Sequence, residues 1–459
     1  MYVRAGKGRT DLSQNGALAS GVPGVTAGLL TALSRFGTKS RSTLLREPIR
    51  LAESGIRLSG LGEEVAADRW KILSPAARTI VGCGSRSRPG VSPCPAGSLI
   101  RQRDLARVLR EISRRGVDGF YRGWVARKIA QGIRNAGGIL SEHDLDAYTA
   151  VTRDPVRGEL DGYELVSMGP PSSGGELLAQ MAGYAERARQ GGYLSGGFGS
   201  AQTLHALAHA MALAFADRAK YLGDPDFIHV PLSQLLSPSY LDLRWKTFDP
   251  AHARIPEGAG ELAVEGGNTT HFSVIDSRGN AVAITTTINN WYGSGFVPPG
   301  TGVFMNDEMD DFSIQPGVPN LFGLVGAEAD AIAPGKRPLS SMSPTIVRDA
   351  RGNVRFVIGG AGGSRIPTAV FDVLVDRLLF GMSLPDAMAA PRVHEQWKPR
   401  QLVLERDGFS PEVRAKLQAM GYEIEQVSSS AKLHALERFP DGRVWGAADP
   451  RGEGAAVAQ

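Results

Sequence analysis

The residues that could do chemistry begin with a threonine pair, Thr269 and Thr270, which follows a Gly-rich stretch and opens an alternating, β-branched segment. The Thr269 hydroxyl could attack the carbonyl of Asn268 and, through an N-to-O acyl shift, leave Thr269 with a free α-amine. That amine would then be the general base for the hydroxyl of the same residue. Threonine pairs also open ordinary strands, so the segment alone leaves both interpretations open.

Other motifs in the chain are typical of common enzyme classes but lack an essential residue. His205 and His209 have the spacing of two zinc ligands on a helix, but Ala206 stands where the general base would be glutamate. We therefore expect two histidines on a helix surface. The glycines of 359–363 lack the Lys-Ser/Thr of a P-loop, and the chain contains no Gly-x-Ser-x-Gly nucleophile elbow.

The composition excludes several classes of protein. The 459 residues are 42% hydrophobic and 21% charged, as in ordinary globular proteins and unlike disordered or collagenous chains. A net charge of +4 over this length does not indicate binding to nucleic acid or to an anionic membrane. No apolar run approaches the roughly 18 residues of a membrane-spanning helix. At about 150 residues per domain the length predicts roughly three domains, although layered α/β folds reach this size as one unit.

The elements that must position these residues are predicted from hydrophobic spacing. A 3.6-residue rhythm predicts helices over 103–114, 125–136, 202–221, 371–380 and 411–420. Ser141 and Asp144 are compatible with a capping box. Alternation and turn residues predict two strand pairs, 271–276 with 281–288 and 344–348 with 354–358. Helices before and after strand pairs indicate sheets covered by helices.

The only cysteines, Cys83 and Cys94, lie in a segment rich in Gly, Ser, Arg and Pro. We interpret them as two free thiols in a surface loop. The alternative is a local disulfide, which would matter in an oxidising compartment. A metal site is not expected, because no second Cys or His pair has suitable spacing.

Ordered motifs along nearly the whole chain resemble the γ-glutamyltransferase (glutathione hydrolase) family of N-terminal-nucleophile hydrolases. In the C-terminal part the resemblance rests on residues 269–276, 306–313, 316–320, 336–345 and 362–366. In the first part it rests on residues 19–24, 170–175 and 216–226. It implies an α/β (α+β) fold, the αββα four-layer sandwich, with Thr269 at the end of a central strand.

The resemblance also implies a proenzyme that cleaves itself between Asn268 and Thr269. The products would be a large-subunit part, 1–268, and a small catalytic subunit, 269–459, which together form one intertwined domain. The two subunits of the same precursor would be each other's partners. No metal and no organic cofactor is implied.

Four residues match the family's catalytic positions. Thr269 matches the nucleophile, and Thr287 matches the threonine that positions its hydroxyl. Gly362 and Gly363 match the oxyanion hole, where glycine lets main-chain N–H groups approach the tetrahedral intermediate closely.

Five further residues match the groups that bind the head of a γ-glutamyl substrate. Asn289, Glu308 and Asp311 match the acceptors for its α-ammonium, and Ser340 and Ser341 match the hydroxyls that bind its α-carboxylate. The implied reaction forms a γ-glutamyl ester on the nucleophile from glutathione-like compounds. Water, an amino acid or a peptide then accepts the γ-glutamyl group.

The family has a longer N-terminal stretch before the point that matches Met1. That stretch contains an export signal and an arginine that binds the substrate α-carboxylate, and no residue of this chain matches that arginine. We expect a start internal to a longer protein rather than a shortened, inactive paralogue, because the downstream motifs are intact. The resemblance implies a periplasmic or secreted protein, whereas a true start at Met1 would imply a cytoplasmic one.

Phe322, in a predicted lid over 316–327, stands where bacterial relatives often carry tyrosine. Without that hydroxyl we expect a looser lid and an altered balance between hydrolysis and transfer. Two rival functions remain. One is a related acylase that cleaves glutaryl-cephalosporins, although Glu308 and Asp311 favour a substrate with an ammonium group. The other is a non-catalytic protein that retains the fold.

Overall fold

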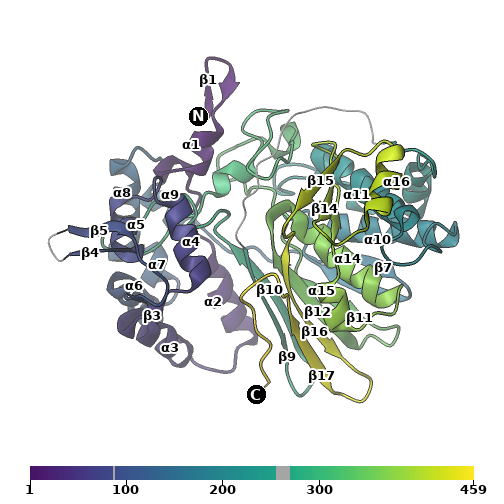
Figure 1. Cartoon of the computed structure of the whole chain (residues 1–459). Coiled ribbons are helices and arrows are strands. Elements are labelled where there is room, and N and C mark those ends of the chain that lie inside the picture. The colour runs from purple at the N-terminus through teal and green to yellow at the C-terminus, as the bar shows by residue number, and fades with distance from the viewer. Residues whose placement is uncertain (86–87, 255–268, 459) are drawn as a thin grey trace. The chain divides into compact units, whose positions relative to one another are not determined.

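The computed structural model describes residues 1–85, 88–254 and 269–458, which form two compact units (Figure 1). The first unit comprises Met1–Thr152 and Ile288–Asp310, and the second comprises Arg153–Thr287 and Asp311–Gln459. The main chain therefore passes between the units three times. The predicted cleavage point falls within the second unit's first segment, and Asn268 itself lies outside the described residues.

The first unit is mostly helical. Its helices are α1 (Thr10–Gln14), η1 (Ala17–Ala19), α2 (Val25–Phe36), α3 (Arg41–Ser54), α4 (Gly60–Arg69), α5 (Pro75–Val81), α6 (Arg103–Arg115), α7 (Asp118–Tyr121), α8 (Gly123–Asn135) and α9 (Glu142–Asp146). Short strand pairs join β1 (Val3–Arg4) to β2 (Lys7–Gly8), β3 (Ile56–Arg57) to β6 (Leu99–Ile100), and β4 (Gly82–Ser85) to β5 (Arg88–Pro93).

The main core of the first unit lies between α6, α7 and α8. Val108 and Ile112 of α6, four residues apart, are buried there, as the 3.6-residue rhythm predicts. Phe296 and Met305, from the 288–310 segment, belong to the same core. That segment is therefore an integral part of the first unit.

The second unit is built on a six-stranded antiparallel sheet. Its strand order is β17 (Val444–Ala448), β16 (Lys432–Arg438), β12 (Val354–Ala361), β11 (Thr345–Arg348), β8 (Tyr163–Ser167) and β7 (Val156–Leu160). A separate hairpin pairs β9 (Thr269–Ile275) with β10 (Ala281–Thr287), and a small sheet contains β13 (Val393–His394), β14 (Leu402–Glu405) and β15 (Ile424–Val427). The helices are α10 (Gly174–Gln190), α11 (Ala201–Tyr221), α12 (Leu232–Leu235), α13 (Pro238–Trp245), α14 (Ile366–Leu378), α15 (Leu384–Ala389) and α16 (Pro411–Ala419), with the 3-10 turns η3 (Glu328–Asp330) and η4 (Gly363–Arg365). A further 3-10 turn, η2 (Glu308–Asp311), spans the last crossing between the units.

The second unit has three successive layers. The β9–β10 hairpin packs on β12 and β16, and helices α10 and α14 pack on the six-stranded sheet (Figure 1). Phe356 and Ile358 of β12 lie in the helix-side core, while the alternate residues Val357 and Gly359 face the hairpin. Strand β12 is thus buried on both faces, which explains its nearly continuous apolar sequence.

The predicted helices and hairpins are confirmed. The Ser141–Asp144 capping box is present, with Ser141 Oγ accepting from the Asp144 N–H. At the β9–β10 turn, the Asp276 carboxylate accepts from the N–H groups of Arg278 and Asn280, both at 2.9 Å. Gly279, with φ +85°, takes the left-handed conformation that this turn requires.

Two sequence-based interpretations are wrong. Cys83 and Cys94 form a disulfide rather than two free thiols. His205 and His209 are buried rather than on a helix surface, because α11 packs on both α10 and α16. They contact a cluster of Trp245, Phe248 and Tyr422 side chains. Among the described residues, no helix is long and apolar enough to cross a bilayer.

Candidate active site

Thr269 is the first residue of β9, and it lies directly opposite Thr287, the last residue of β10. The Thr269 hydroxyl donates to the Thr287 hydroxyl oxygen at 3.3 Å. The predicted pairing of nucleophile and positioning threonine thus has a structural basis in the hairpin register. Both side chains are partly exposed, so a substrate could reach the Thr269 hydroxyl.

A chain of hydrogen bonds anchors β9 to β12 through His271. Ser273 Oγ donates to the Val357 carbonyl at 3.0 Å, so this hydroxyl accepts from His271 Nε2, also at 3.0 Å. The other ring nitrogen, Nδ1, accordingly accepts from the Thr285 hydroxyl at 2.8 Å. Burial lowers the pKa of His271 to about 3, so the ring is neutral at physiological pH and suits these two different roles.

The contacts of β9 with β12 also fix how the hairpin packs on the strand that leads to the glycine pair. The His271 ring lies 2.4 Å from the point where Gly359 would carry a Cβ, and Ser273 bonds Val357. Two residues forward on β9 thus correspond to two residues back on β12. Strand β12 ends at Ala361, directly before Gly362, so it runs from the His271 contact toward the glycine pair.

Gly362 and Gly363 form the junction between β12 and the turn η4, which runs on into α14. Their φ angles are +148° and +57°, conformations that favour glycine. A Cβ on Gly362 would lie 2.7 Å from Ala431 Cβ. The first N–H groups of a helix have no partner within it, so this junction can present donors to a developing oxyanion.

Ser340 and Ser341 are held by the Pro-Ser-Ser-Gly-Gly motif of the earlier chain segment. The Ser340 N–H donates to the Pro171 carbonyl at 2.9 Å. The Ser340 carbonyl accepts from both the N–H and the hydroxyl of Ser173, each at 2.8 Å. Because the main chain is fixed in this way, the two serine side chains have defined positions; Ser341 is buried and Ser340 is partly exposed.

Asp311 is buried in a charged cluster behind this serine segment. The cluster's cation is Arg218 on α11, which is itself buried and is attracted by Asp330 and Asp311. Arg218 Nε donates to Ser173 Oγ at 3.0 Å. Burial raises the pKa of Asp330 to about 7, partly offset by Arg218. The cluster thus combines the carboxylate of Asp311, which suits a substrate cation, with the buried positive charge of Arg218.

Asn289 and Glu308 lie in the first unit, and the second unit contains the other predicted site residues. Asn289 is buried, with φ +73°, and its Nδ2 donates to the Asp307 carbonyl at 3.2 Å. The N–H of Glu308 donates to Asn306 Oδ1, which also accepts from the Gly21 N–H at 2.8 Å. The motif at 19–24 therefore supports the segment that carries Glu308, and η2 joins Glu308 to Asp311 along the chain.

The predicted lid, 316–327, is a compact loop with Phe322 near its tip. Asn320 Oδ1 accepts from the N–H groups of Phe322 and Leu324, at 3.0 and 3.1 Å. The Phe322 ring approaches within 2.3 Å of the position that a Cβ on Gly363 would take. The lid tip therefore lies directly on the glycine pair.

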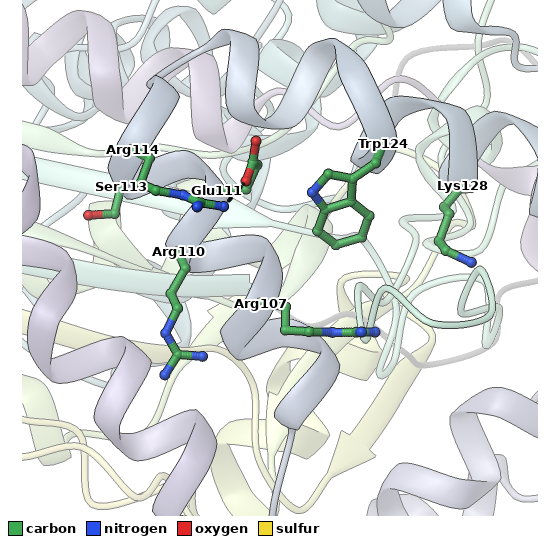
Figure 2. Close-up of a pocket in the computed structure, with 7 residues that line it drawn as sticks. All are labelled: Arg107, Arg110, Glu111, Ser113, Arg114, Trp124 and Lys128. Carbon is green, nitrogen blue, oxygen red and sulfur yellow. Dashed lines mark hydrogen bonds and ion pairs between the residues drawn. The ribbon is translucent and has the colours of Figure 1, made fainter.

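A cavity of about 460 Å³ lies elsewhere, in the first unit (Figure 2). Its lining residues are Arg107, Arg110, Glu111, Ser113, Arg114, Trp124 and Lys128. None is a predicted site residue, and the three arginines are paired with carboxylates. Among the residues that the structure describes, no group of three or more His, Cys, Asp or Glu side chains could hold a metal ion.

Several residues that support the site were not predicted. His271 and Ser173 lie within recognised motifs, but the residue types alone did not indicate what they bond. Gly359 lies in the glycine run 359–363, whose spacing does not indicate a contact with His271. Arg218 lies within the motif 216–226, but its burial and that of Asp330 depend on contacts between distant parts of the chain.

Comparison with known proteins gives a consistent result over the whole chain. A family model described as gamma-glutamyltranspeptidase matches residues 1–459. The glutathione hydrolase proenzyme of Escherichia coli (strain K12) is 39% identical over 439 residues, covering 95% of this chain and 74% of that protein. The proenzyme of the same name from Pseudomonas aeruginosa is 40% identical over 452 residues, with coverages of 97% and 79%.

Among solved structures, the cephalosporin acylase from Bacillus halodurans superposes with a TM-score of 0.81 at 25% identity. The match covers 97% of this chain and 79% of that one. The mixed helices and packed sheets of the chain, together with this neighbour, give the α/β sandwich fold of the N-terminal-nucleophile hydrolases, in agreement with the predicted fold class. Family model and relatives agree over nearly the full length, and the chain belongs to the γ-glutamyltranspeptidase family.

Proposed function

We propose that the protein is a self-processing γ-glutamyltransferase and glutathione hydrolase whose nucleophile is Thr269. The observation that carries the proposal is the pairing of Thr269 with Thr287 at the open end of the β9–β10 hairpin. The hairpin packs on β12, and β12 ends directly before Gly362. A nucleophilic hydroxyl, a hydroxyl that orients it and two oxyanion donors would thereby be supplied by the ends of β9, β10 and β12.

Self-cleavage would begin with attack of Thr269 Oγ1 on the carbonyl of the preceding residue. The acyl group moves from nitrogen to oxygen, and water then hydrolyses the ester. The products are a carboxyl terminus at Asn268 and a free α-amine on Thr269. Thr287, opposite the nucleophile, accepts the hydrogen bond that orients its hydroxyl.

In turnover the α-amine of Thr269 takes the proton from its own hydroxyl as the oxygen attacks the γ-amide carbonyl. Gly362 and Gly363 N–H groups stabilise the oxyanion, and each such donor is worth about 2.7–4 kcal/mol. The amine then protonates the leaving nitrogen, which gives the γ-glutamyl ester. In the second half, water or an acceptor amine attacks the ester carbonyl while it loses a proton to the same α-amine. The bond from the carbonyl carbon to the Thr269 oxygen then breaks, that oxygen takes the proton back from the amine, and glutamate or the new γ-glutamyl amide leaves.

Separate residues of the protein would bind the two charges of the substrate head group. Ser340 and Ser341 would donate to the α-carboxylate, and their main chain is fixed by Pro171 and Ser173. Asp311 would accept from the α-ammonium, together with Asn289 and Glu308 by resemblance to the family.

A denaturing gel with N-terminal sequencing tests the proposal. The wild-type chain should give two bands, and the smaller band should begin at Thr269. Thr269→Ala should remain one band without turnover of a γ-glutamyl anilide. A folded wild-type protein that stays as a single inactive chain would contradict the proposal.

A glutaryl acylase is the second candidate, because a cephalosporin acylase has the same fold over nearly the whole chain. A glutaryl group has no α-ammonium and so gains nothing from the buried carboxylate of Asp311. Comparing kcat/KM for γ-glutamyl and glutaryl anilides decides between them. Asp311→Asn should lower the first value and leave the second nearly unchanged.

We also propose that the protein works in an oxidising compartment, the periplasm or outside the cell. The Cys83–Cys94 disulfide supports this, because disulfides persist there and are rare in the cytosol. Alkylation of the native, unreduced protein followed by mass measurement should leave both cysteines unmodified.

A further inference from the structure

A buried amide, the side chain of Gln396, lies between the lid and the glycine pair. It is only 8% exposed. Its Nε2 donates to the main-chain carbonyl of Phe322 at 2.9 Å and to that of Lys398 at 3.0 Å. Both amide hydrogens are therefore used, and Oε1 is left to accept.

The acceptor side of the amide is also fully occupied. Oε1 accepts from Ser364 Oγ at 2.7 Å and from His394 Nε2 at 2.9 Å. The Thr368 hydroxyl lies 2.8 Å from His394 Nδ1, and burial lowers the pKa of His394 to about 3, so the ring stays neutral. The orientation of the Gln396 amide follows from the two main-chain carbonyls that Nε2 faces, because a carbonyl oxygen can only accept.

This amide joins two parts of the candidate site. Ser364 follows Gly363, the residue on which the Phe322 ring lies. Gln396 therefore bonds Ser364 through Oε1 and the Phe322 carbonyl, at the tip of the lid, through Nε2. The bond to the lid reaches a main-chain carbonyl, so it does not depend on which side chain residue 322 carries.

We propose that Gln396 is a positioning residue, a latch that keeps the lid 316–327 closed on Gly363. Its effect on turnover rests on the proposed function, whereas the latch itself does not. A closed lid excludes water from the acyl-enzyme. Release of the latch would therefore shift the reaction from transfer toward hydrolysis.

Two substitutions of Gln396 and a matched control test the latch. Gln396→Met removes all four hydrogen bonds, and Gln396→Glu keeps an acceptor while losing the donors to Phe322 and Lys398. Gln180→Met is the control, since Gln180 is a buried amide whose Nε2 donates to Asp217 and to the Leu235 carbonyl, both at 3.1 Å. It has the same chemistry and contacts another part of the second unit.

The first measurement is hydrogen–deuterium exchange of the full-length protein over residues 318–324. Both Gln396 variants should exchange about tenfold faster there, the effect of losing one buried hydrogen bond on local opening. Gln180→Met should match the wild type in this segment. Unchanged exchange in the Gln396 variants, or an equal rise in Gln180→Met, would overturn the proposal.

The second measurement is the ratio of transfer to hydrolysis, from γ-glutamyl anilide turnover with and without a dipeptide acceptor. The ratio should fall in both Gln396 variants and should equal the wild-type value in Gln180→Met. If the Gln396 variants exchange faster over residues 318–324 but keep the wild-type ratio, the proposed effect of the lid on transfer and hydrolysis is overturned. A wild type without any turnover would contradict the proposed function, while the exchange data would still decide the latch. If Gln396→Glu does not fold, Gln396→Met carries the test, because it introduces no charge.

Discussion

The imidazole of His271 occupies the space that a side chain on Gly359 would need, 2.4 Å from the ideal Cβ position. The contact joins the hairpin that begins with Thr269 to the strand that leads into Gly362. Together with the hydrogen bond from Ser273 to the Val357 carbonyl, this contact fixes how the hairpin packs on β12 within the second unit. Adding a single methyl group at residue 359 should therefore affect both folding and self-cleavage.

Gly359→Ala should destabilise the protein and slow self-cleavage. The added methyl group must displace the His271 ring, and overpacking of this kind costs about 1–3 kcal/mol. Urea unfolding measures the stability, and the appearance of the smaller band on a gel measures the cleavage. Gly28→Ala is the control, because a Cβ there meets no atom within 4 Å. The alignment argument fails if Gly359→Ala cleaves at the wild-type rate.

Thr287→Val should slow self-cleavage and turnover, because the nucleophile loses the hydroxyl oxygen that accepts its hydrogen bond at 3.3 Å. A net hydrogen bond of about 0.5–1.5 kcal/mol corresponds to a loss of up to roughly tenfold. Thr287→Ser should recover most of the rate. Thr286→Val, on the neighbouring residue that pairs with Thr270, serves as the control. Equal rates for the valine variants at 286 and 287 would remove Thr287 from the mechanism.

Phe322→Tyr should alter the balance between hydrolysis and transfer, because a hydroxyl at the lid tip adds a group that can hydrogen-bond. The Gly363 contact of the ring is preserved, so folding should be unaffected. Transfer and hydrolysis rates with one donor substrate provide the measurement. An identical ratio in both proteins would show that a hydroxyl at residue 322 has no role in the lid.

Acid should destabilise the protein partly through His209. Burial lowers the pKa of this imidazole to about 3, so it stays neutral in the folded protein, whereas the unfolded chain binds a proton below about pH 6.5. The unfolded state thus holds more protons between these values, and stability is lost as the pH falls from about 6.5 toward 3. The slope from this group reaches about 1.4 kcal/mol per pH unit.

Urea unfolding at several pH values from 4 to 7 measures that slope. His209→Gln should reduce it, whatever the substitution does to the stability at pH 7. His252→Gln is the matched substitution at a histidine whose side chain is 72% exposed. Parallel curves for His209→Gln and the wild type would contradict the assignment.

The sequence predicted the parts of this structure that depend on local pattern. The hairpin from Thr269 to Thr287 has alternation and a turn with Asp276 and Gly279, and both signals act within a few residues. The capping box at Ser141 is equally local. Candidate site residues could be named from ordered motifs, although their roles remain predictions.

The remaining features depend on contacts between distant parts of the chain. His271 against Gly359 and Gln396 against Phe322 carry no local signal, because neither residue type indicates its partner. The burial of His209 depends on the packing of α11 against both α10 and α16, and a missing zinc-site glutamate does not indicate that packing. The state of the two cysteines is not encoded locally either, because a short loop is compatible with both redox states.

The three crossings of the main chain have a consequence for the mature protein. Phe296 and Met305, from after residue 268, complete the core of the first unit, and Leu177 and Phe215, from before it, share a core with Phe356 in the second. A cut at residue 268 would leave two polypeptides, each threaded through both cores. Neither could be released without unfolding both units. The cleaved protein should accordingly show no measurable dissociation on dilution, and recovery from denaturant should require both fragments in the same solution.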